Sequence, residues 1–366
     1  MNNSDLLYKI AFSQLYGIGP ARAQKILKKI EHPKDFFFLN FKELHRITEI
    51  PLQTLQNTNP KRALISAQAQ LNFLNHYKVN YHFISDPLYP KRLRQCPDAP
   101  IGIFFRGCGP YWNRPKCIAI VGAREKTNYG TQIVDELISK LPKDIIVLSG
   151  LAKGIDACVH QKCIEFGLST YGVLGHGLDQ IYPKSNGQIA NLMLENGGLI
   201  SEFLIGVKPE KMNFPMRNRI IAGMADAVIV VESKKNGGSL ITAELANDYN
   251  REVFAFPNQI FKIESEGCHQ LIANNKAHLL SNTNDLLKFM NWSFNTKQLS
   301  TLNKPQTNNL IEKKIISCFQ IKPTWSIDEL LIEINQPVSL INGALFELEL
   351  QNLIKNIGAN RYSLPL

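Results

Sequence analysis

Five short loops between Cys117 and Glu244 contain the residue types that could bind an anion. They combine glycines, whose missing Cβ lets a ligand approach the backbone, with Arg and Lys side chains. Most follow an apolar run and lead into a helix-like segment, where free backbone N–H groups favour phosphate. The loops are 122–124 (GAR), 149–154 (SGLAKG), 175–177 (GHG), 217–219 (RNR) and 237–239 (GGS). Their composition and spacing predict a site that binds a phosphate chain.

Four positions could each hold one phosphate group. Arg124 lies between a predicted strand and a predicted helix, so its guanidinium can act together with N-terminal helix amides. Lys184 lies in a turn after another strand, residues 217–219 form a third loop, and residues 238–244 open a helix. A single basic loop is more often a solvated charge or a surface ion pair, but four at the strand ends of one sheet favour a shared cationic groove. The predicted binding residues are Gly122, Arg124, Lys184, Asn186, Arg217, Asn218, Arg219, Gly238, Ser239 and Thr242.

No motif for catalysis or for a bound cofactor is complete in this sequence. It has no Walker A loop, no Gly-x-Ser-x-Gly nucleophile turn and no His-Glu-x-x-His metal motif. The 175–177 loop begins a dinucleotide fingerprint, but Gln180 stands where the third glycine belongs. His160 is expected to pack on a helix and His176 to lie in a loop, without an identifiable nucleophile beside either. We therefore predict no catalytic residue, no metal and no cofactor.

Alternating strands and helices across about residues 79–290 must position these loops. Short apolar runs, mostly β-branched, are expected to be strands with both faces covered. They cover 81–84, 103–105, 118–121, 145–148, 170–174, 198–201, 227–231 and 253–256. Helical patterns cover 129–141, 156–166, 188–195 and 239–249. The repeated units predict an α/β fold with a doubly wound, mostly parallel sheet, which binds ligands at the carboxyl ends of its strands.

Residues 1–78 are predicted to form a small helical domain. Gly17-Ile18-Gly19 separates two helical segments, and Pro20 suits the first turn of the second one. This turn resembles that of a helix-hairpin-helix, in which glycine N–H groups approach a phosphate. It is equally consistent with an ordinary turn that packs two helices together. Further helices are expected at 41–47 and 62–77.

The C-terminal part is predicted to be a separate small domain behind a linker. Residues 291–309 are polar and rich in Asn, Thr, Ser and Lys, which is typical of a linker. Within 310–366, helical patterns lie at 310–319, 327–334 and 338–351, and a hairpin-like segment follows at 353–364. Three helices and a wing match a winged helix, a module that often binds DNA. Glu347 and Glu349 on the third predicted helix favour protein contact or packing over reading a DNA groove.

Composition and charge are those of a folded protein that favours polyanions. Hydrophobic residues make up 44% and charged residues 20% of the 366 residues, and the formal net charge is +10. Excess positive charge favours nucleic acid through counterion release, a trait shared with ribosome-associated and membrane-surface proteins. We find no apolar run long enough for a bilayer and no signal-peptide pattern. The seven cysteines form no Cys-x-x-Cys pair, which indicates reduced, buried thiols in a cytoplasmic protein.

Six motifs in a fixed order carry a family resemblance. They are IAIVGAR (118–124), LSGLAKGIDACVH (148–160), VLGHGLDQIYPKSN (173–186), GGLISEF (197–203), FPMRNRIIAGMADAVIVVE (214–232) and GGSLITAELA (237–246). Together they resemble the DNA-processing protein A family (DprA/Smf) over most of 79–290. The sequence departs from the family pattern at Asn250-Arg251, Pro257-Asn258 and Gly267-Cys268-His269. These departures lie away from Arg124 and Lys184 and affect the 250–276 surface, a candidate dimer surface.

The resemblance implies a fold, a role and partners. The family has an extended Rossmann domain, often with a sterile-alpha-motif-like N-terminal domain and a C-terminal winged helix. On this chain those domains are expected at 79–290, 1–78 and 310–366. Family members bind single-stranded DNA, form homodimers through the Rossmann domain and load the recombinase RecA, protecting incoming DNA during natural transformation. For this protein we accordingly expect a non-enzymatic role. The resemblance implies that Arg124 and Lys184 contact DNA and that residues 217–219 help to form the binding pocket.

Two other functions remain consistent with the residues. The segment 236–244 resembles the Gly-rich loop of nucleotide phosphoribohydrolases, with Asn236 in place of a proline and Ile241 in place of a glycine. Release of free base from AMP would indicate such an enzyme. A sequence-specific regulator acting through the winged helix is the other alternative, and it would lose DNA binding when residues 305–366 are deleted.

Overall fold

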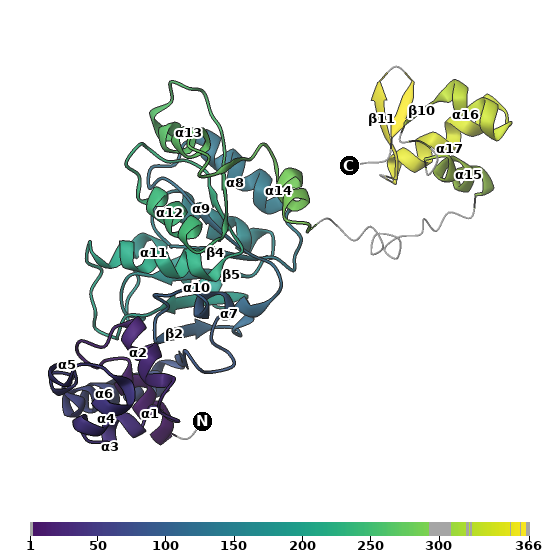
Figure 1. Ribbon diagram of the computed structural model, residues 1–366. Coiled ribbons are helices and arrows are strands. Elements are labelled where there is room, and N and C mark those ends of the chain that lie inside the picture. Colours follow the sequence, from purple (N-terminus) through teal and green to yellow (C-terminus); the bar gives the residue numbers. More distant parts are fainter. Residues whose placement is uncertain are drawn as a thin grey trace. The chain divides into compact units, whose positions relative to one another are not determined.

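The computed structural model describes residues 3–292 and 309–363, except 320, 321, 323, 352 and 359. The chain forms two compact units, residues 1–293 and 294–366 (Figure 1). The predicted linker at 291–309 lies almost entirely outside the described residues. Each unit has its own hydrophobic core and is described by itself.

A nine-stranded sheet forms the centre of the first unit. Its strands are β1 (Asn80–Phe83), β2 (Gly102–Gly107), β3 (Cys117–Val121), β4 (Ile146–Ser149), β5 (Thr170–Leu174), β6 (Gly197–Ser201), β7 (Ala227–Val230), β8 (Glu252–Ala255) and β9 (His278–Leu279). Their order is β1-β2-β6-β5-β4-β3-β7-β8-β9, with parallel pairing from β6 to β9 and antiparallel pairing at β1 and β2. The predicted mostly parallel α/β sheet is therefore confirmed. The eight predicted strands each lie within two residues of an observed one, whereas β9 was not predicted.

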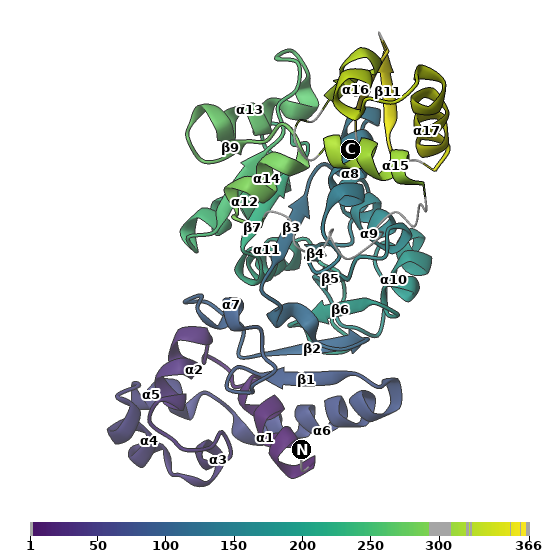
Figure 2. The same ribbon diagram turned by 90° about the vertical axis from the view of Figure 1, so that its right-hand side faces the viewer.

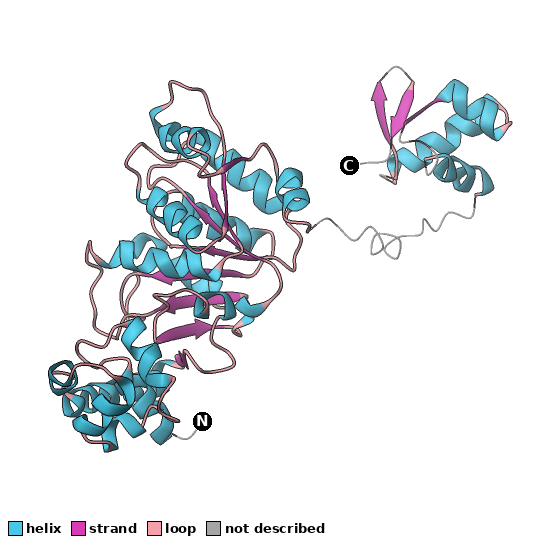
Figure 3. Ribbon diagram, in the orientation of Figure 1, coloured by secondary structure: helices cyan, strands magenta, loops and turns pink. Residues whose placement is uncertain are grey.

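Helices cover both faces of this sheet (Figure 3). Alternate residues of β3 belong to different hydrophobic clusters, with Ala119 in one and Ile118 and Ile120 in the other. The cluster of Ile118 includes α8 (Asn128–Lys140), α9 (Ile155–Glu165) and α14 (Thr283–Phe289). The cluster of Ala119 includes α10 (Gly187–Met193), α11 (Asn213–Met224), α12 (Gly238–Asp248) and α13 (Glu266–Ala273). Because both of their faces are buried, inner strands such as β3 and β7 are continuous apolar runs in the sequence.

The N-terminal residues are helical, as predicted, and they pack on the β1 edge of the sheet (Figure 2). The helices are α1 (Asn3–Phe12), α2 (Pro20–Leu27), α3 (Asp35–Phe38), α4 (Phe41–Thr48), α5 (Leu52–Gln56) and α6 (Pro60–Tyr77). The ring of Phe12 meets that of Phe83 edge-on at 6.0 Å between centroids. Nearby, Lys9 Nζ lies 2.8 Å from Asp86 Oδ1 in a mostly buried ion pair. One hydrophobic cluster thus continues from these helices into the sheet across the expected boundary at residue 78.

Residues 217–219 lie within α11, so the prediction of a loop there is wrong. Pro215 is the third residue of this helix, in the first turn, where a missing N–H breaks no intrahelical hydrogen bond. Successive helical residues point about 100° apart. Three adjacent side chains therefore cannot converge on one ligand, as they could from a loop.

Among its described residues, the second unit contains three helices and a three-stranded sheet. Its elements are α15 (Leu310–Cys318), β10 (Thr324–Ser326), α16 (Ile327–Ile334), α17 (Val338–Leu350), β11 (Lys355–Gly358) and β12 (Arg361–Ser363). The helices and the final hairpin were predicted, whereas β10 was not. Ser326 and Glu329 form a capping box that starts α16. This order of elements is the one expected of a winged helix, and Glu347 and Glu349 lie on α17, as predicted.

The cysteines form no disulfide, and six are buried while Cys108 is exposed. Of the helices that the structure describes, none has the length and the apolar character needed to span a membrane.

Candidate nucleic-acid interface

The sheet has a topological switch point beside β3. From β3 the chain adds β4, β5 and β6 on one side, and then places β7 on the other side of β3. The loops that follow β3 and β7 therefore diverge at the carboxyl edge of the sheet, where open α/β sheets bind ligands. A groove of about 880 Å³ opens there. We call it the switch-point groove, and it is lined by the loops after β3 and β7, by α11 and by the start of α12.

The loop that carries Arg124 is held in place by close packing and by a buried carboxylate. A Cβ on Gly122 would lie 2.6 Å from Ile155 Cγ1, so a glycine is needed for α9 to approach. Thr127 caps α8 by accepting from the N–H of Gly130 at 3.1 Å. The N–H of Thr127 donates to Glu232 Oε2 at 3.2 Å, and its hydroxyl donates to Oε1. Since Glu232 is fully buried at the end of β7, it joins the two sides of the switch point.

Arg124 and two aromatic rings form the open part of the groove. Arg124 is exposed and makes no ion pair within the described chain. Its guanidinium carbon lies 5.6 Å from the ring centroid of Phe214. The Phe214 ring lies 6.0 Å from the ring of Tyr182, whose exposed fraction is 50%. A cation beside two accessible rings can bind a phosphate and stack on a base.

A smaller pocket of about 70 Å³ lies beside these rings. It shares Arg124, Tyr182 and Phe214 with the groove and adds Lys153 and His176. His176 is buried in its loop, and its Nε2 has no hydrogen-bond partner in the structure as described. Burial lowers the pKa of His176, which favours the neutral ring.

Arg217 lies beneath the groove, where its role differs from the predicted phosphate contact. It is 5% exposed, and its Nη1 donates to the carbonyl oxygens of Gly150, at 2.6 Å, and Val173. Burial lowers the pKa of Arg217 to about 10, against the attraction of nearby Asp156. Burial also raises the pKa of Asp156, and Arg217 opposes that rise. The guanidinium therefore joins the ends of β4 and β5 and positions the groove floor.

Arg219 and Asn186 are also directed away from the groove, contrary to the sequence prediction. Arg219 pairs with Glu202 and donates to the carbonyl oxygen of Asp98. Asn186 is buried, and its Nδ2 donates to the carbonyl oxygens of Leu151 and Ala152, at 2.9 and 3.1 Å. The backbone φ of Leu151 is +57°, an uncommon value for a non-glycine residue, so Asn186 stabilises a constrained loop.

The other predicted residues lie at the groove or next to it. Asn218 lines the groove, and its Nδ2 donates to the carbonyl oxygen of Gly238 at 3.4 Å. Gly238, Ser239 and Thr242 line the start of α12, whose N-cap Gly237 has no side chain to occupy the free amides. Lys184 is exposed in a short 3₁₀ helix (Lys184–Asn186), two residues after Tyr182 and outside the groove lining.

Several lysines at the rim were missing from the predicted site. Lys211, Lys234 and Lys235 line the groove and are exposed, and Lys234 pairs with Glu125 at 3.2 Å between Nζ and Oε2. Lys234 and Lys235 lie in the loop that follows the apolar β7 segment, a few residues beyond the end of the strand, which is a signal that sequence reading could have used. Lys211 has no such signal, because it lies in a long irregular segment between β6 and α11.

His160 packs within the fold, as the sequence predicts. His160 is fully buried on α9, and its Nδ1 lies 2.7 Å from Thr170 Oγ1. Burial lowers its pKa to about 3, so the ring stays neutral at physiological pH. Glu244, the acidic residue of the phosphoribohydrolase-like segment, is exposed outside the groove lining and pairs with Lys276 at 3.3 Å. No group of His, Cys, Asp or Glu side chains among the described residues could hold a metal ion.

Comparisons with known proteins agree with this architecture. The family model described as DNA recombination-mediator protein A matches residues 80–291. The curated Protein Smf of Synechocystis sp. is 34% identical over 300 residues, which cover 78% of this chain and 73% of that protein. The X-ray structure of DNA processing protein A from Streptococcus pneumoniae matches with a TM-score of 0.65 and 34% identity, over 79% of this chain and 98% of that one. A structure of DNA processing protein A from Helicobacter pylori, described for its single-stranded DNA binding mode, matches with a TM-score of 0.54 and 26% identity, over 59% and 97%.

Proposed function

The chain belongs to the DNA recombination-mediator protein A family, and from that membership we propose that it binds single-stranded DNA in the switch-point groove. In this role it protects incoming DNA during natural transformation and loads RecA onto the strand. The observation that carries the proposal is the exposed Arg124 guanidinium beside the rings of Tyr182 and Phe214 in one groove. The Helicobacter pylori relative, whose structure concerns single-stranded DNA, supports the choice of ligand.

A single strand fits the groove better than a duplex. Aromatic rings stack on bases that are not paired, and each stacked base contributes about 1–3 kcal/mol. Arg124, Lys211 and Lys235 supply cations without ion-pair partners in the part of the chain that is described, so phosphates can bind without first displacing an internal carboxylate. At Gly238 a Cβ would meet no atom within 4 Å, so a strand can approach the backbone closely there.

Binding, rather than catalysis, is the activity we propose. The two histidines that could act as bases are buried, and their pKa values are lowered by that burial. Glu244 forms an ion pair with Lys276 outside the groove lining, which does not favour the phosphoribohydrolase alternative. The groove instead offers phosphate and base contacts.

The proposed activity can be tested by fluorescence anisotropy with one labelled sequence as a single strand and as a duplex, at two salt concentrations. We expect tighter binding to the single strand, with an affinity that falls steeply as salt rises because each neutralised phosphate releases counterions. Adding RecA should then give faster filament assembly on strands that carry this protein. Tighter binding to the duplex, or no dependence on salt, would contradict the proposal.

We also propose that the protein forms a homodimer through the Rossmann-like domain, by way of an apolar patch near β8. Ile260, Phe261 and Ile263 have exposed fractions of 73%, 91% and 60%, and they are close together in sequence. Neighbouring large apolar side chains at such exposure are typical of a protein interface.

Phe261→Asp should therefore yield a monomer at concentrations where the unchanged protein is a dimer, because the new charge would be desolvated at the interface. Sedimentation velocity measures this directly. The control is Phe38→Asp, which changes an aromatic side chain of 73% exposure on α3 and should leave the dimer intact. A dimer that persists in Phe261→Asp would place the interface elsewhere.

A further inference from the structure

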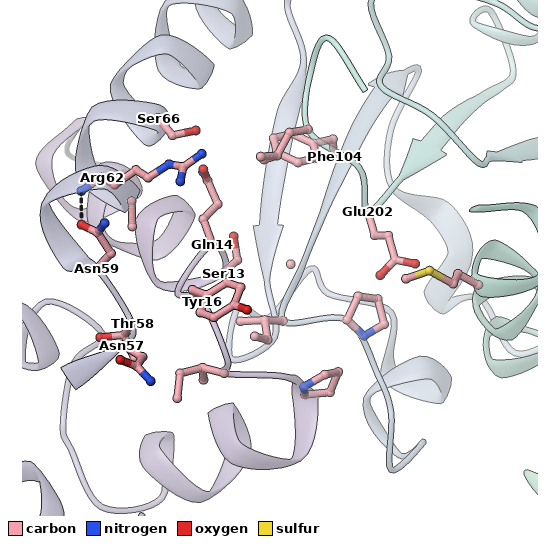
Figure 4. A pocket seen from close by; sticks show the side chains of 18 of the residues that line it. Ser13, Gln14, Tyr16, Asn57, Thr58, Asn59, Arg62, Ser66, Phe104 and Glu202 are labelled. Atoms are coloured by element: carbon pink, nitrogen blue, oxygen red, sulfur yellow. Dashed lines mark hydrogen bonds between the residues drawn. The ribbon is translucent and has the colours of Figure 1, made fainter. Parts of the chain in front are cut away.

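A second large cleft lies at the same edge of the sheet as the switch-point groove. Its volume is about 850 Å³, and it lies between the N-terminal helices and the sheet (Figure 4). The sheet wall is formed where β2 begins and β6 ends, since these strands pair antiparallel with Phe104 opposite Ser201. The helical wall carries Tyr16 and Arg62. We call this space the hairpin cleft, because Tyr16, Ile18 and Pro20 of the predicted hairpin turn form part of its lining.

The Gly17-Ile18-Gly19 turn lies at the edge of the cleft, where Ile18 is a lining residue. Gly17 has a φ of +73°, and a Cβ placed on Gly19 would meet no atom within 4 Å, so a ligand can reach the backbone. Gly19 is the N-cap of α2 and brings no side chain to the free amides of that helix. Arg22 Nη1 donates to the carbonyl oxygen of Gly17 at 2.7 Å, which fixes the turn.

The side chains of the cleft have the chemistry of a nucleotide site. Tyr16 is 74% exposed, far more than an aromatic ring used for packing, and it can stack on a base. Arg62 is exposed without an ion pair in the described chain, so it can bind a phosphate. Gln14 and Asn57 add amides, which recognise the donor and acceptor edges of bases.

The opposite wall carries an unsatisfied acceptor. Figure 4 shows Glu202 directed into the cleft, across from Tyr16 and Arg62. One carboxylate oxygen of Glu202 pairs with Arg219, while the other, Oε1, is buried with no hydrogen-bond partner among the described residues. A buried acceptor without a partner is costly, and an N–H group of a bound ligand would satisfy it. Every nucleobase has such a group on its pairing edge.

Helix α11 lies between the two clefts and contributes lining residues to both. Its residues Phe214 and Asn218 line the switch-point groove, whereas Met216 and Arg219 line the hairpin cleft. A strand that leaves the groove need only pass over one helix, a width of about 10–12 Å. At a stacked spacing of about 3.4 Å, that is about three nucleotides.

We propose that the hairpin cleft binds the continuation of the same single strand, with Tyr16 stacking on a base, and with Arg62 and the amides of the glycine turn holding a phosphate. This inference rests on the proposed function of the switch-point groove and extends its site across α11. It gives the glycine turn a nucleic-acid role, one of the two alternatives left open by its sequence.

The test compares oligothymidylates of increasing length against the full-length protein and a Tyr16→Ala/Arg62→Ala variant. A short strand fills the switch-point groove alone, so the variant should bind it like the unchanged protein. A longer strand reaches the hairpin cleft, and there the variant should bind about tenfold more weakly, as expected for one lost stack. Phe38→Ala/Lys61→Ala is the matched control, since Lys61 is exposed beside Arg62 on α6, Phe38 is an exposed ring on α3, and neither residue lines the cleft.

A Tyr16→Trp variant supplies an independent signal. Its added fluorescence should be quenched by the longer strand and unchanged by the short one. Equal affinities of Tyr16→Ala/Arg62→Ala and the unchanged protein for every length would overturn the inference while leaving the groove proposal intact. Equal losses at all lengths would also overturn it. If the proposed function itself is wrong, the result will differ: the unchanged protein will bind no single strand, whatever its length.

Discussion

Replacing Arg124 and Lys184 together with alanine is expected to weaken binding to oligothymidylate about a hundredfold. A hydrogen bond to a charged group contributes about 1.5–3 kcal/mol. Losing two such phosphate contacts therefore costs at least about 3 kcal/mol of binding free energy, which corresponds to about a hundredfold in affinity. Both side chains are exposed and neither forms an ion pair within the described residues, so the fold should be unaffected. Fluorescence anisotropy measures the affinity, and urea unfolding confirms that stability is unchanged.

The matched control removes the same charge elsewhere. Lys42 on α4 and Lys288 on α14 are exposed and do not line either cleft. Lys42→Ala/Lys288→Ala should lower affinity only slightly, through the loss of long-range attraction. Equal effects of the two double variants would mean that net charge, rather than the groove, binds the strand.

Arg217→Ala should instead destabilise the fold, by about 3–5 kcal/mol, the cost of removing one partner from a buried charged network. The change leaves the carbonyl oxygens of Gly150 and Val173 without a donor and leaves buried Asp156 without its positive neighbour. The midpoint of urea unfolding should fall accordingly. Asn218→Ala is the control, because the adjacent side chain makes a single hydrogen bond of 3.4 Å and should change stability little.

An unchanged unfolding midpoint for Arg217→Ala, combined with a large loss of DNA affinity, would contradict the positioning role. It would restore the direct phosphate contact that the sequence suggested. The two outcomes can be distinguished. Replacing a buried residue that supports the groove floor lowers the free energy of unfolding, whereas replacing a surface contact lowers only the affinity for DNA.

The strands of the sheet could be predicted because both of their faces are buried. A run such as Ile118–Val121 is apolar at every position, and glycines or polar turns mark its ends. The loops at the carboxyl edge follow from the same pattern. Strand β9 could not be predicted in this way, since His278 and Leu279 are exposed at the sheet edge and form a very short strand.

Side-chain direction within the site was less predictable. Arg217 and Arg219 have the same chemistry and similar neighbours in the sequence, yet helix geometry directs them to the groove floor and to Glu202. In the sequence Asn186 resembles a surface turn residue, but in the structure it is buried and its Nδ2 donates to the carbonyl oxygen of Leu151. The direction of such side chains depends on three-dimensional packing, which cannot be predicted from a local pattern of residue types.

Photocrosslinking of a 5-iodouracil-substituted single strand to the full-length protein tests the central claim most directly. If the strand lies in the switch-point groove, the crosslinked peptides identified by mass spectrometry should contain Tyr182 or Phe214, whose rings face the bound bases. Crosslinks confined to peptides from residues 309–363 would place the strand on the second unit and contradict the proposal.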